Sequence, residues 1–375
     1  MKNYYFDNSA TSSPKPEAVY KALEIGVREY NANPGRAGHR KAVEAGRKIY
    51  EVREKIAKFF NVKNSLNIAF TANATESLNF AIKGGIPQNS HVITTNFEHN
   101  SVLRPLFYMQ DEKNIKLTFV NTYDEIEKNI TSETKAVVIN HISNVNGTIQ
   151  NIEEIGEICK KHNLLFILDA SQSAGYSYID MEKHNISILC LTGHKSLFGI
   201  QGIGAICLRD NVKIEPLLEG GTGSFSKLSR QPKEMPELLE AGTINTPGVI
   251  SLGAGIDFIN EIGLDEIREH ENRLTKRFID GLKDIEKIKI YKSLTGEQGP
   301  VVSLNIDGVD SGDLAQILDE EFGIFVRPGF HCAPLAHKVI GTYETGTVRF
   351  SFGYFNTDEE IEFALSTLEN IALQI

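Results

Sequence analysis

The stretch LLFILDASQSAG, residues 164–175, opens with the longest apolar run of the chain and places a carboxylate, Asp169, where that run ends. Helical patterns separate this run from the others, one beginning near Ala74 and one covering about 152–162. The other short apolar runs are NIAFT (67–71), HVITT (91–95), AVVIN (136–140), ILCLT (188–192) and GAICL (204–208). Such an alternation predicts an α/β fold whose mainly parallel sheet is covered on both faces, with ligands gathered beyond the carboxyl ends of its strands.

The pattern changes after Pro247 and predicts a smaller α+β domain. A long amphipathic helix is expected over about 264–285 and another after Ser311, with a last helix opened by Thr357 and the acids that follow it. Strands are expected at 301–306, 324–328 and 348–352. We assign residues 16–246 to a large domain, and residues 1–15 together with 247–375 to a small one.

Composition narrows the possible functions. The 375 residues carry 39 basic and 49 acidic side chains, a net charge of −10 without a basic block, which argues against nucleic acid as a partner. No apolar run approaches the roughly 18 residues that cross a bilayer, and the first residues lack the apolar core of a signal peptide. Four cysteines without a C-x-x-C pair indicate neither a disulfide framework nor a metal site, so we expect a cytoplasmic protein.

Common catalytic signatures are missing. The sequence has no G-x-G-x-x-G after its first strand, no Gly-Lys dipeptide of a P-loop, no G-x-S-x-G and no H-E-x-x-H. A dinucleotide-dependent dehydrogenase, a P-loop NTPase, an α/β-hydrolase and a zinc protease are therefore disfavoured.

Polar residues follow two of the apolar strands. Asp169 and Lys195 are separated by about one βαβ step, so their strand ends can lie side by side. A lysine beside apolar walls loses solvation, its pKa falls, and its neutral amine can attack a carbonyl. The alternatives are that Asp169 caps the next turn and that Lys195 lies solvated in a turn. Thr75, at the start of a helix, could contact a phosphate or could simply cap that helix.

A pyridoxal phosphate site needs three features: a binding site for the phosphate, a lysine that reacts with the aldehyde, and an acid that pairs with the pyridinium nitrogen. Three motifs, D-A-S-Q (169–172), T-G-H-K (192–195) and A-G-T-x-N-T (241–246), give the chain a specific resemblance to fold-type I pyridoxal phosphate enzymes of the class V aminotransferase group. The resemblance extends from YFDNSAT (5–11) to VRFSF (348–352) and is strongest to cysteine desulfurases. It implies a large domain with a seven-stranded sheet.

The resemblance also implies roles for individual residues. Lys195 would bind the cofactor aldehyde, Asp169 would pair with the pyridine N–H, and His99 would stack on the ring, a surface position being the alternative for His99. Asn144 and Gln172 would donate hydrogen bonds to the ring hydroxyl. The phosphate contacts would come from Ala74, Thr75, Thr192 and His194. Thr243 would reach the site of a neighbouring subunit, which implies a homodimer with shared sites.

Cys332 lies in the loop segment R-x-G-x-H-C-A, which resembles the active-site loop of group II desulfurases, whereas NPGRAGH (33–39) is more similar to group I chains. Only a thiolate is nucleophilic, and we expect Arg327 and His331 to favour it, an inert exposed thiol being the alternative. Arg349 is expected to bind the substrate carboxylate together with Asn144 and Arg327, although an arginine alternating with apolar neighbours could also face solvent. Arg36 and His39 could border the substrate entrance or belong to a solvated loop.

The resulting hypothesis is a pyridoxal-phosphate-dependent cysteine desulfurase. Lys195 would remove the Cα proton of bound L-cysteine, Cys332 thiolate would attack the substrate sulfur and keep it as a persulfide, and His99 would move protons while alanine leaves. An acceptor protein would take the sulfur, with iron–sulfur cluster assembly as one destination. Selenocysteine lyase, another class V aminotransferase-type enzyme and a non-catalytic cofactor-binding scaffold for sulfur transfer are the alternatives.

Overall fold

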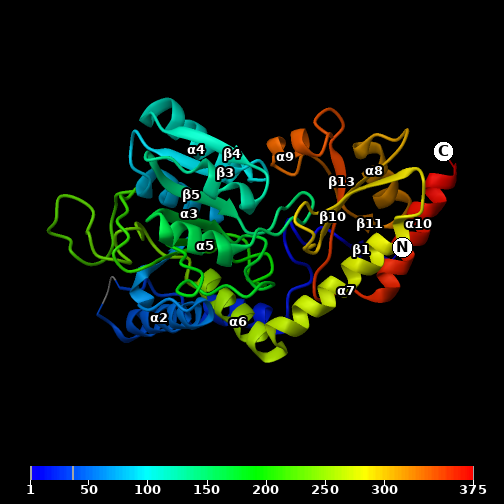
Figure 1. The fold of residues 1–375 in the computed structure, drawn as a ribbon. Coiled ribbons are helices and arrows are strands. Elements are labelled where there is room, and N and C mark those ends of the chain that lie inside the picture. The colour runs from blue at the N-terminus through cyan, green and yellow to red at the C-terminus, as the bar shows by residue number, and fades with distance from the viewer. Residues whose placement is uncertain (1, 36–37, 375) are drawn as a thin grey trace.

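A computed structural model describes residues 2–35 and 38–374, and its centre is a seven-stranded sheet (Figure 1). In spatial order the strands are β2 (Ile68–Thr71), β8 (Gly204–Leu208), β7 (Ile188–Thr192), β6 (Leu165–Asp169), β5 (Thr134–Asn140), β3 (His91–Thr95) and β4 (Lys116–Val120). All neighbours pair in parallel except β8, which runs antiparallel to β2 and β7. The predicted mainly parallel, seven-stranded sheet is therefore confirmed. The sequence analysis did not identify β4, because this edge strand is only partly buried and lacks a continuous apolar run.

Helices cover both faces of this sheet, as expected from its apolar strands. Along β5, Val137 and Ile139 belong to one buried cluster while Ala136 and Val138 belong to another, so successive side chains enter cores on opposite faces. The first core is closed by α2 (Arg40–Phe60), α5 (Ile152–Lys161) and α6 (Thr246–Ile262), with α1 (Glu17–Arg28) packed on α6. The second is closed by α3 (Ala74–Asn79), the π-helical turn η2 (Phe80–Gly84) and α4 (Asn100–Lys113).

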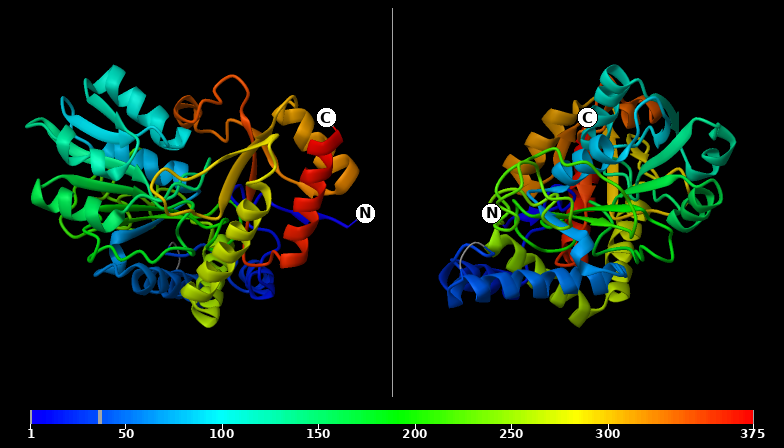
Figure 2. Two further views of the ribbon diagram at one scale, coloured as in Figure 1. Left: turned by 45° about the vertical axis from the view of Figure 1, so that its right-hand side comes forward. Right: turned by 90° about the vertical axis from the view of Figure 1, so that its left-hand side faces the viewer.

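The C-terminal part forms a second, antiparallel sheet with its own core. Its strands, in order, are β12 (Arg327–Gly329), β13 (Thr347–Ser351), β10 (Val301–Ile306) and β9 (Ile288–Tyr291). Its helices are α7 (Leu264–Leu282), α8 (Ser311–Phe322), α9 (Pro334–Val339) and α10 (Asp358–Gln374). The expected strand at 324–328 is divided into β12 and β11 (Ile324–Phe325), and β11 pairs in parallel with β1 (Tyr4–Tyr5) instead. Both chain ends therefore lie on this side of the molecule (Figures 1 and 2).

The border between the two parts stays a proposal, and the packing of α6 refines it. Val249, Leu252 and Ile256 of α6 enter the core of the large sheet, whereas Leu274 and Phe278 of α7 enter that of the small one. We therefore propose that the small domain begins near Gly263 rather than at 247. Among the described residues, no helix is both long and apolar enough to span a bilayer.

Candidate active site

A cavity of about 230 Å³ opens at the carboxyl edge of the large sheet, where the small domain meets it. Most of the side chains predicted to form the site line this cavity, whereas Cys332, Thr243, His331 and His39 are not in its lining. The predicted residues that line it are Ala74, Thr75, His99, Asn144, Asp169, Gln172, Thr192, His194, Lys195, Arg327 and Arg349. The lining also includes residues that the sequence analysis missed, chiefly Ser9, Asn73, Ser101, Asn140 and Ser171.

Lys195 follows β7 and projects into the cavity rather than into solvent, so the solvated-turn alternative is wrong. Burial lowers the pKa of Lys195 to about 8, and the negative charge of Asp169 partly opposes that shift. The peptide of Lys195 is held as well, because Ser12 Oγ donates to its carbonyl oxygen at 2.8 Å. About a tenth of this amine is therefore neutral, and nucleophilic, at pH 7.

Asp169 ends β6 beside β7, where it pairs with Cys190, so the predicted adjacency of the two strand ends is confirmed. Burial raises the pKa of Asp169, while hydrogen bonds from Ser171 and the charge of Lys195 lower it. Its Oδ1 accepts from the backbone N–H of Ser171 at 2.9 Å. Ser171 belongs to the turn that follows β6, so Asp169 does cap that turn, as the alternative interpretation expected. Asp169 also lines the cavity, where its carboxylate can meet a cationic group.

His99 is the N-cap of α4 and is also part of the cavity wall. Its Nδ1 accepts from the backbone N–H of Ser101 at 3.0 Å, so the proton of the neutral ring belongs on Nε2. Burial, with the charges of Lys195 and Arg327, lowers the pKa of His99 to about 4. The ring is therefore neutral at physiological pH and can exchange a proton only through Nε2.

Hydroxyl groups gather at one end of the cavity. Thr75 Oγ1 lies 2.7 Å from Ser101 Oγ, and Thr192 is close by in the lining. The cap of α3 is Asn73, whose Oδ1 accepts from the N–H of Glu76, so plain capping does not explain Thr75. The sequence analysis overlooked Ser101, although it stands two positions after His99 in the same motif.

His194 carries a buried polar atom that lacks a partner. Its Nδ1 has no hydrogen-bond partner within the described part of the chain, and burial lowers the pKa of the ring to about 4. The residue lines the cavity near Thr192. An oxygen-rich anion bound there would supply the missing hydrogen-bond partner.

Two amide side chains predicted to contact the cofactor ring are partly engaged by the backbone. Gln172 Nε2 donates to the carbonyl oxygen of Ser9 at 3.0 Å, and Asn144 Nδ2 donates to that of His331 at 2.6 Å. Both residues line the cavity, so their contacts with a ring hydroxyl stay a prediction. Asn144 already links the cavity wall to the residue just before Cys332.

Arg349 is 1% exposed, so the alternative of a solvent-facing side chain is wrong. The alternation along β13 is as expected, because Val348 and Phe350 lie in the core of the small domain. The opposite face is covered by the N-terminal segment around Asp7 and by Asn144 of the large domain instead of water. Arg349 donates from Nη2 to Asp7 Oδ1 at 2.6 Å and from Nη1 to the carbonyl oxygen of Asn144 at 3.0 Å. The sequence analysis did not foresee the contribution of Asp7.

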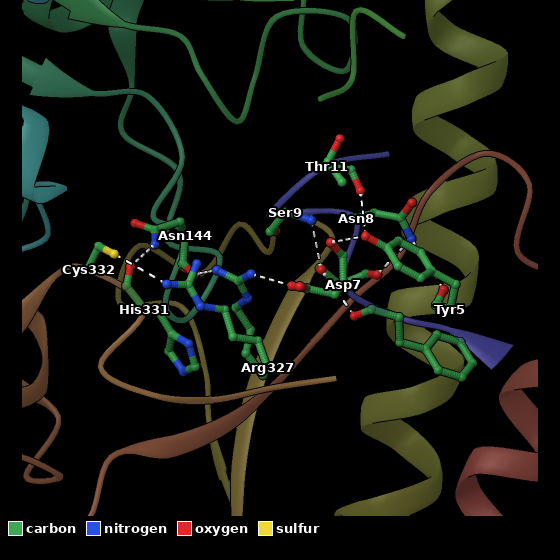
Figure 3. A network of polar contacts seen from close by, with 12 residues as sticks. Tyr5, Asp7, Asn8, Ser9, Thr11, Asn144, Arg327, His331 and Cys332 are labelled. Atoms are coloured by element: carbon green, nitrogen blue, oxygen red, sulfur yellow. Dashed lines mark hydrogen bonds and ion pairs between the residues drawn. The ribbon is translucent and has the colours of Figure 1, made fainter. Parts of the chain in front are cut away.

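Cys332 belongs to this network of polar contacts (Figure 3), and its partner Arg327 lines the cavity. Arg327 Nη2 donates to Cys332 Sγ at 3.2 Å, so the two side chains are in contact, and the expectation that Arg327 favours a thiolate stays a prediction. The same expectation for His331 is wrong. Burial and the nearby charge of Arg349 hold the pKa of His331 well below its usual range, so its ring is neutral and offers no charge to the thiol.

Two predicted positions lie away from this chain's own cavity. Thr243 Oγ1 accepts from Asn33 Nδ2 at 3.3 Å and lines a separate hollow. His39 caps α2 by accepting from the N–H of Ala42, and Arg36 lies outside the described residues. The role of Thr243 in a neighbouring subunit stays a prediction.

The sequence was compared with known protein families and with curated proteins, and the matches agree with the geometry of the site. Residues 4–363 match the family model described as Aminotransferase class-V. The chain belongs to the class V aminotransferase family. This class V chain is 35% identical to a probable cysteine desulfurase of Methanothermobacter thermautotrophicus, over 99% of the chain and 96% of the relative. It is 38% identical to a probable cysteine desulfurase of Pyrococcus abyssi, over 98% of the chain and 94% of the relative.

A solved structure supports the same assignment. The apo structure of a cysteine desulfurase from Thermococcus onnurineus NA1 superposes with a TM-score of 0.92 at 36% identity, covering 100% of this class V chain and 95% of the other. The predicted resemblance and the fold-type I architecture are thus confirmed.

Proposed function

We propose that this class V protein is a pyridoxal-phosphate-dependent cysteine desulfurase, which converts L-cysteine to L-alanine and keeps the sulfur as a persulfide. One observation carries the proposal: the Cys332 thiol contacts Arg327, and Arg327 lines the cavity that also contains Lys195 and Asp169. A lysine and an aspartate alone would suit many enzymes of this fold. The neighbouring thiol is what favours sulfur chemistry.

The residues present fit pyridoxal phosphate. Lys195 supplies an amine of lowered pKa, and Asp169 supplies a buried carboxylate for the pyridine N–H. The unpartnered Nδ1 of His194, with the hydroxyls of Thr75 and Thr192, suits the phosphate, and Ala74 lines the same wall. When bound, the cofactor would stabilise the negative charge that develops on the substrate as its Cα proton leaves.

The remaining steps belong to side chains. Arg349 would bind the substrate carboxylate, with Arg327 and Asn144 beside it, because a guanidinium fork matches a carboxylate. Lys195 would remove the Cα proton, and the neutral His99 would exchange protons through Nε2. Cys332 thiolate would then attack the substrate sulfur. The new S–S bond forms as the Cβ–S bond breaks, and the electron pair of the broken bond stays on Cβ. A proton is then added to Cβ, and Lys195 returns a proton to Cα, which completes alanine.

Partners follow from this chemistry. A persulfide on Cys332 needs a thiol acceptor, so we propose an acceptor protein that approaches the Cys332 loop. We also propose a homodimer in which Thr243 completes the neighbour's phosphate site. L-selenocysteine would bind through the same contacts, and comparing turnover of the two amino acids would separate a lyase preference from a desulfurase.

The decisive experiment measures alanine released from L-cysteine by the purified, cofactor-loaded protein. The unchanged protein should release alanine, whereas Cys332→Ala should keep the visible absorbance of bound cofactor and lose sulfur release. Cys159→Ala is a matched control, because Cys159 lies 1% exposed in the core. Full sulfur release by Cys332→Ala would refute the role of Cys332, and absence of alanine from the unchanged protein would favour a scaffold. Formation of a keto acid from an amino donor would instead indicate a transaminase.

A further inference from the structure

The backbone at the Cys332 loop has an uncommon conformation. His331 and Cys332 are consecutive non-glycine residues with positive φ, 49° and 59°. Residues with a Cβ rarely adopt this left-handed region, and two in a row persist only where the surroundings hold them. The cause should therefore be visible in the contacts of these two residues.

Three hydrogen bonds hold this pair from different elements. The carbonyl oxygen of His331 accepts from Asn144 Nδ2 at 2.6 Å, and that of Cys332 accepts from the backbone N–H of Asn100 at 2.7 Å. The ring of His331 is 1% exposed, and its Nε2 lies 2.8 Å from the hydroxyl of Thr347, a fully buried residue on β13. Asn144 and Asn100 come from the large domain and Thr347 from the small one.

The ring of His331 has no chemical task in the cavity. It is absent from the cavity lining, and a neutral ring cannot act as a counter-ion for the thiol. Its partner Thr347 belongs to β13, the strand that also carries Arg349 two residues after Thr347. The ring is thus tied to the same strand as the carboxylate clamp.

We infer that His331 is a positioning residue, whose hydrogen bond to Thr347 keeps residues 331 and 332 left-handed and so keeps Cys332 Sγ against Arg327. The inference rests on the proposed function, because it assigns the anchor of the proposed nucleophile. Without the anchor the two residues relax, and the thiol turns away from the guanidinium that stabilises its charged form. The carboxylate clamp at Arg349 stays in place.

Thr347→Val tests the anchor, because it removes the hydroxyl and keeps the shape. In the cofactor-loaded protein, alkylation of Cys332 by iodoacetamide at pH 7, followed by mass spectrometry, should be at least about fivefold slower, because the thiol loses its contact with Arg327. The kcat for alanine formation should fall about tenfold with an unchanged KM for L-cysteine. Thr347→Ser, which keeps the hydroxyl, should restore both.

Thr342→Val is the matched control. Thr342 is also buried, and its hydroxyl lies 2.8 Å from Nδ1 of His337 near the same loop, without a contact to the backbone of Cys332. It should leave alkylation of Cys332 and kcat within twofold of the unchanged protein. Equal losses in Thr342→Val and Thr347→Val would overturn the inference, because they would indicate general loosening.

His331→Asn is a second variant that removes the hydrogen bond to Thr347, for use if Thr347→Val does not fold. Asparagine tolerates positive φ but is too short to replace the ring at Thr347. Slow alkylation at pH 7 supports the anchor, and a rate within twofold of the unchanged protein overturns it. The alkylation readout does not need turnover. A protein that makes no alanine would thus refute the proposed function and still leave the anchor testable.

Discussion

Asp7 neutralises Arg349 across 342 positions of sequence, with Oδ1 of the acid 2.6 Å from Nη2 of the base. The guanidinium side chain is 1% exposed and the carboxylate 22% exposed. A buried charge without a partner is costly, so this contact is what allows a cation to lie at the junction of the two domains.

The pair predicts a large loss of stability when one partner is removed. Asp7→Ala should reduce the free energy of unfolding by about 3 kcal/mol, because it leaves Arg349 buried and unpaired. Asp7→Ala combined with Arg349→Met should be less destabilised than the two single changes added together. Urea unfolding of the four proteins gives the coupling. Lys116→Ala, which breaks an exposed pair with Glu133, should cost less than about 1 kcal/mol. Additive losses at Asp7 and Arg349 would contradict the coupling.

Lys195 should be the amine that captures an aldehyde. With cofactor removed, the rate at which Lys195 reacts with added pyridoxal phosphate should rise with pH around a midpoint near 8, since burial lowers its pKa to about 8. Borohydride reduction followed by peptide mass spectrometry locates the adduct. Lys195→Arg keeps the charge but should form no adduct at this position. An equal yield of adduct in that variant, on another lysine, would mean that the assignment is mistaken.

Glu98 should make stability depend on pH. Burial raises its pKa to about 8, while the unfolded chain has an ordinary carboxyl, so the folded state binds the extra proton between about pH 5 and 8. Its contribution to stability is therefore complete at low pH and is lost as pH rises, by about 1.4 kcal/mol per pH unit in that window.

Glu98→Gln tests this effect. Between pH 5 and 8 the free energy of unfolding of this variant should fall less steeply with pH, because glutamine does not titrate. The variant should still fold, because its amide oxygen can accept from Thr95 and from the N–H of Asn140. Glu271, also buried with a pKa raised to about 8, should keep its own share, so some slope should persist. An unaltered slope in Glu98→Gln would show that Glu98 does not carry the proton.

Gly175 should be intolerant of a side chain. A Cβ built there would lie 2.1 Å from the carbonyl oxygen of Ser196, next to Lys195, and φ is +92°. Gly175→Ala should lower the free energy of unfolding by about 2 kcal/mol or more and weaken cofactor binding, because Ser196 must move. Gly296→Ala has a similar positive φ of +85° and open space, so it isolates the backbone strain. If both variants lose the same free energy of unfolding, the contact with Ser196 does not contribute to the intolerance of Gly175.

The sequence by itself determined the strands and the cofactor side of the site. A short continuous apolar run such as 164–168 is a local signal of a buried strand, so the strands of the large sheet could be predicted. The polar residues Asp169 and Lys195 follow two such runs, so the edge of the sheet that bears the site could be predicted as well. The resemblance then placed His99 and Cys332, because each stands in a short motif. The partly exposed edge strand β4 lacked such a run and was missed.

Only the tertiary structure decided which side chains from separate segments of the chain meet. Nothing local to Arg349 indicates that Asp7 neutralises it, and nothing local to His331 distinguishes a charged neighbour of the thiol from a neutral ring anchored on Thr347. Burial and pairing of polar groups depend on residues far apart in the chain. Their energies are therefore set when distant segments of the chain pack together, rather than by the order of residues in any one segment.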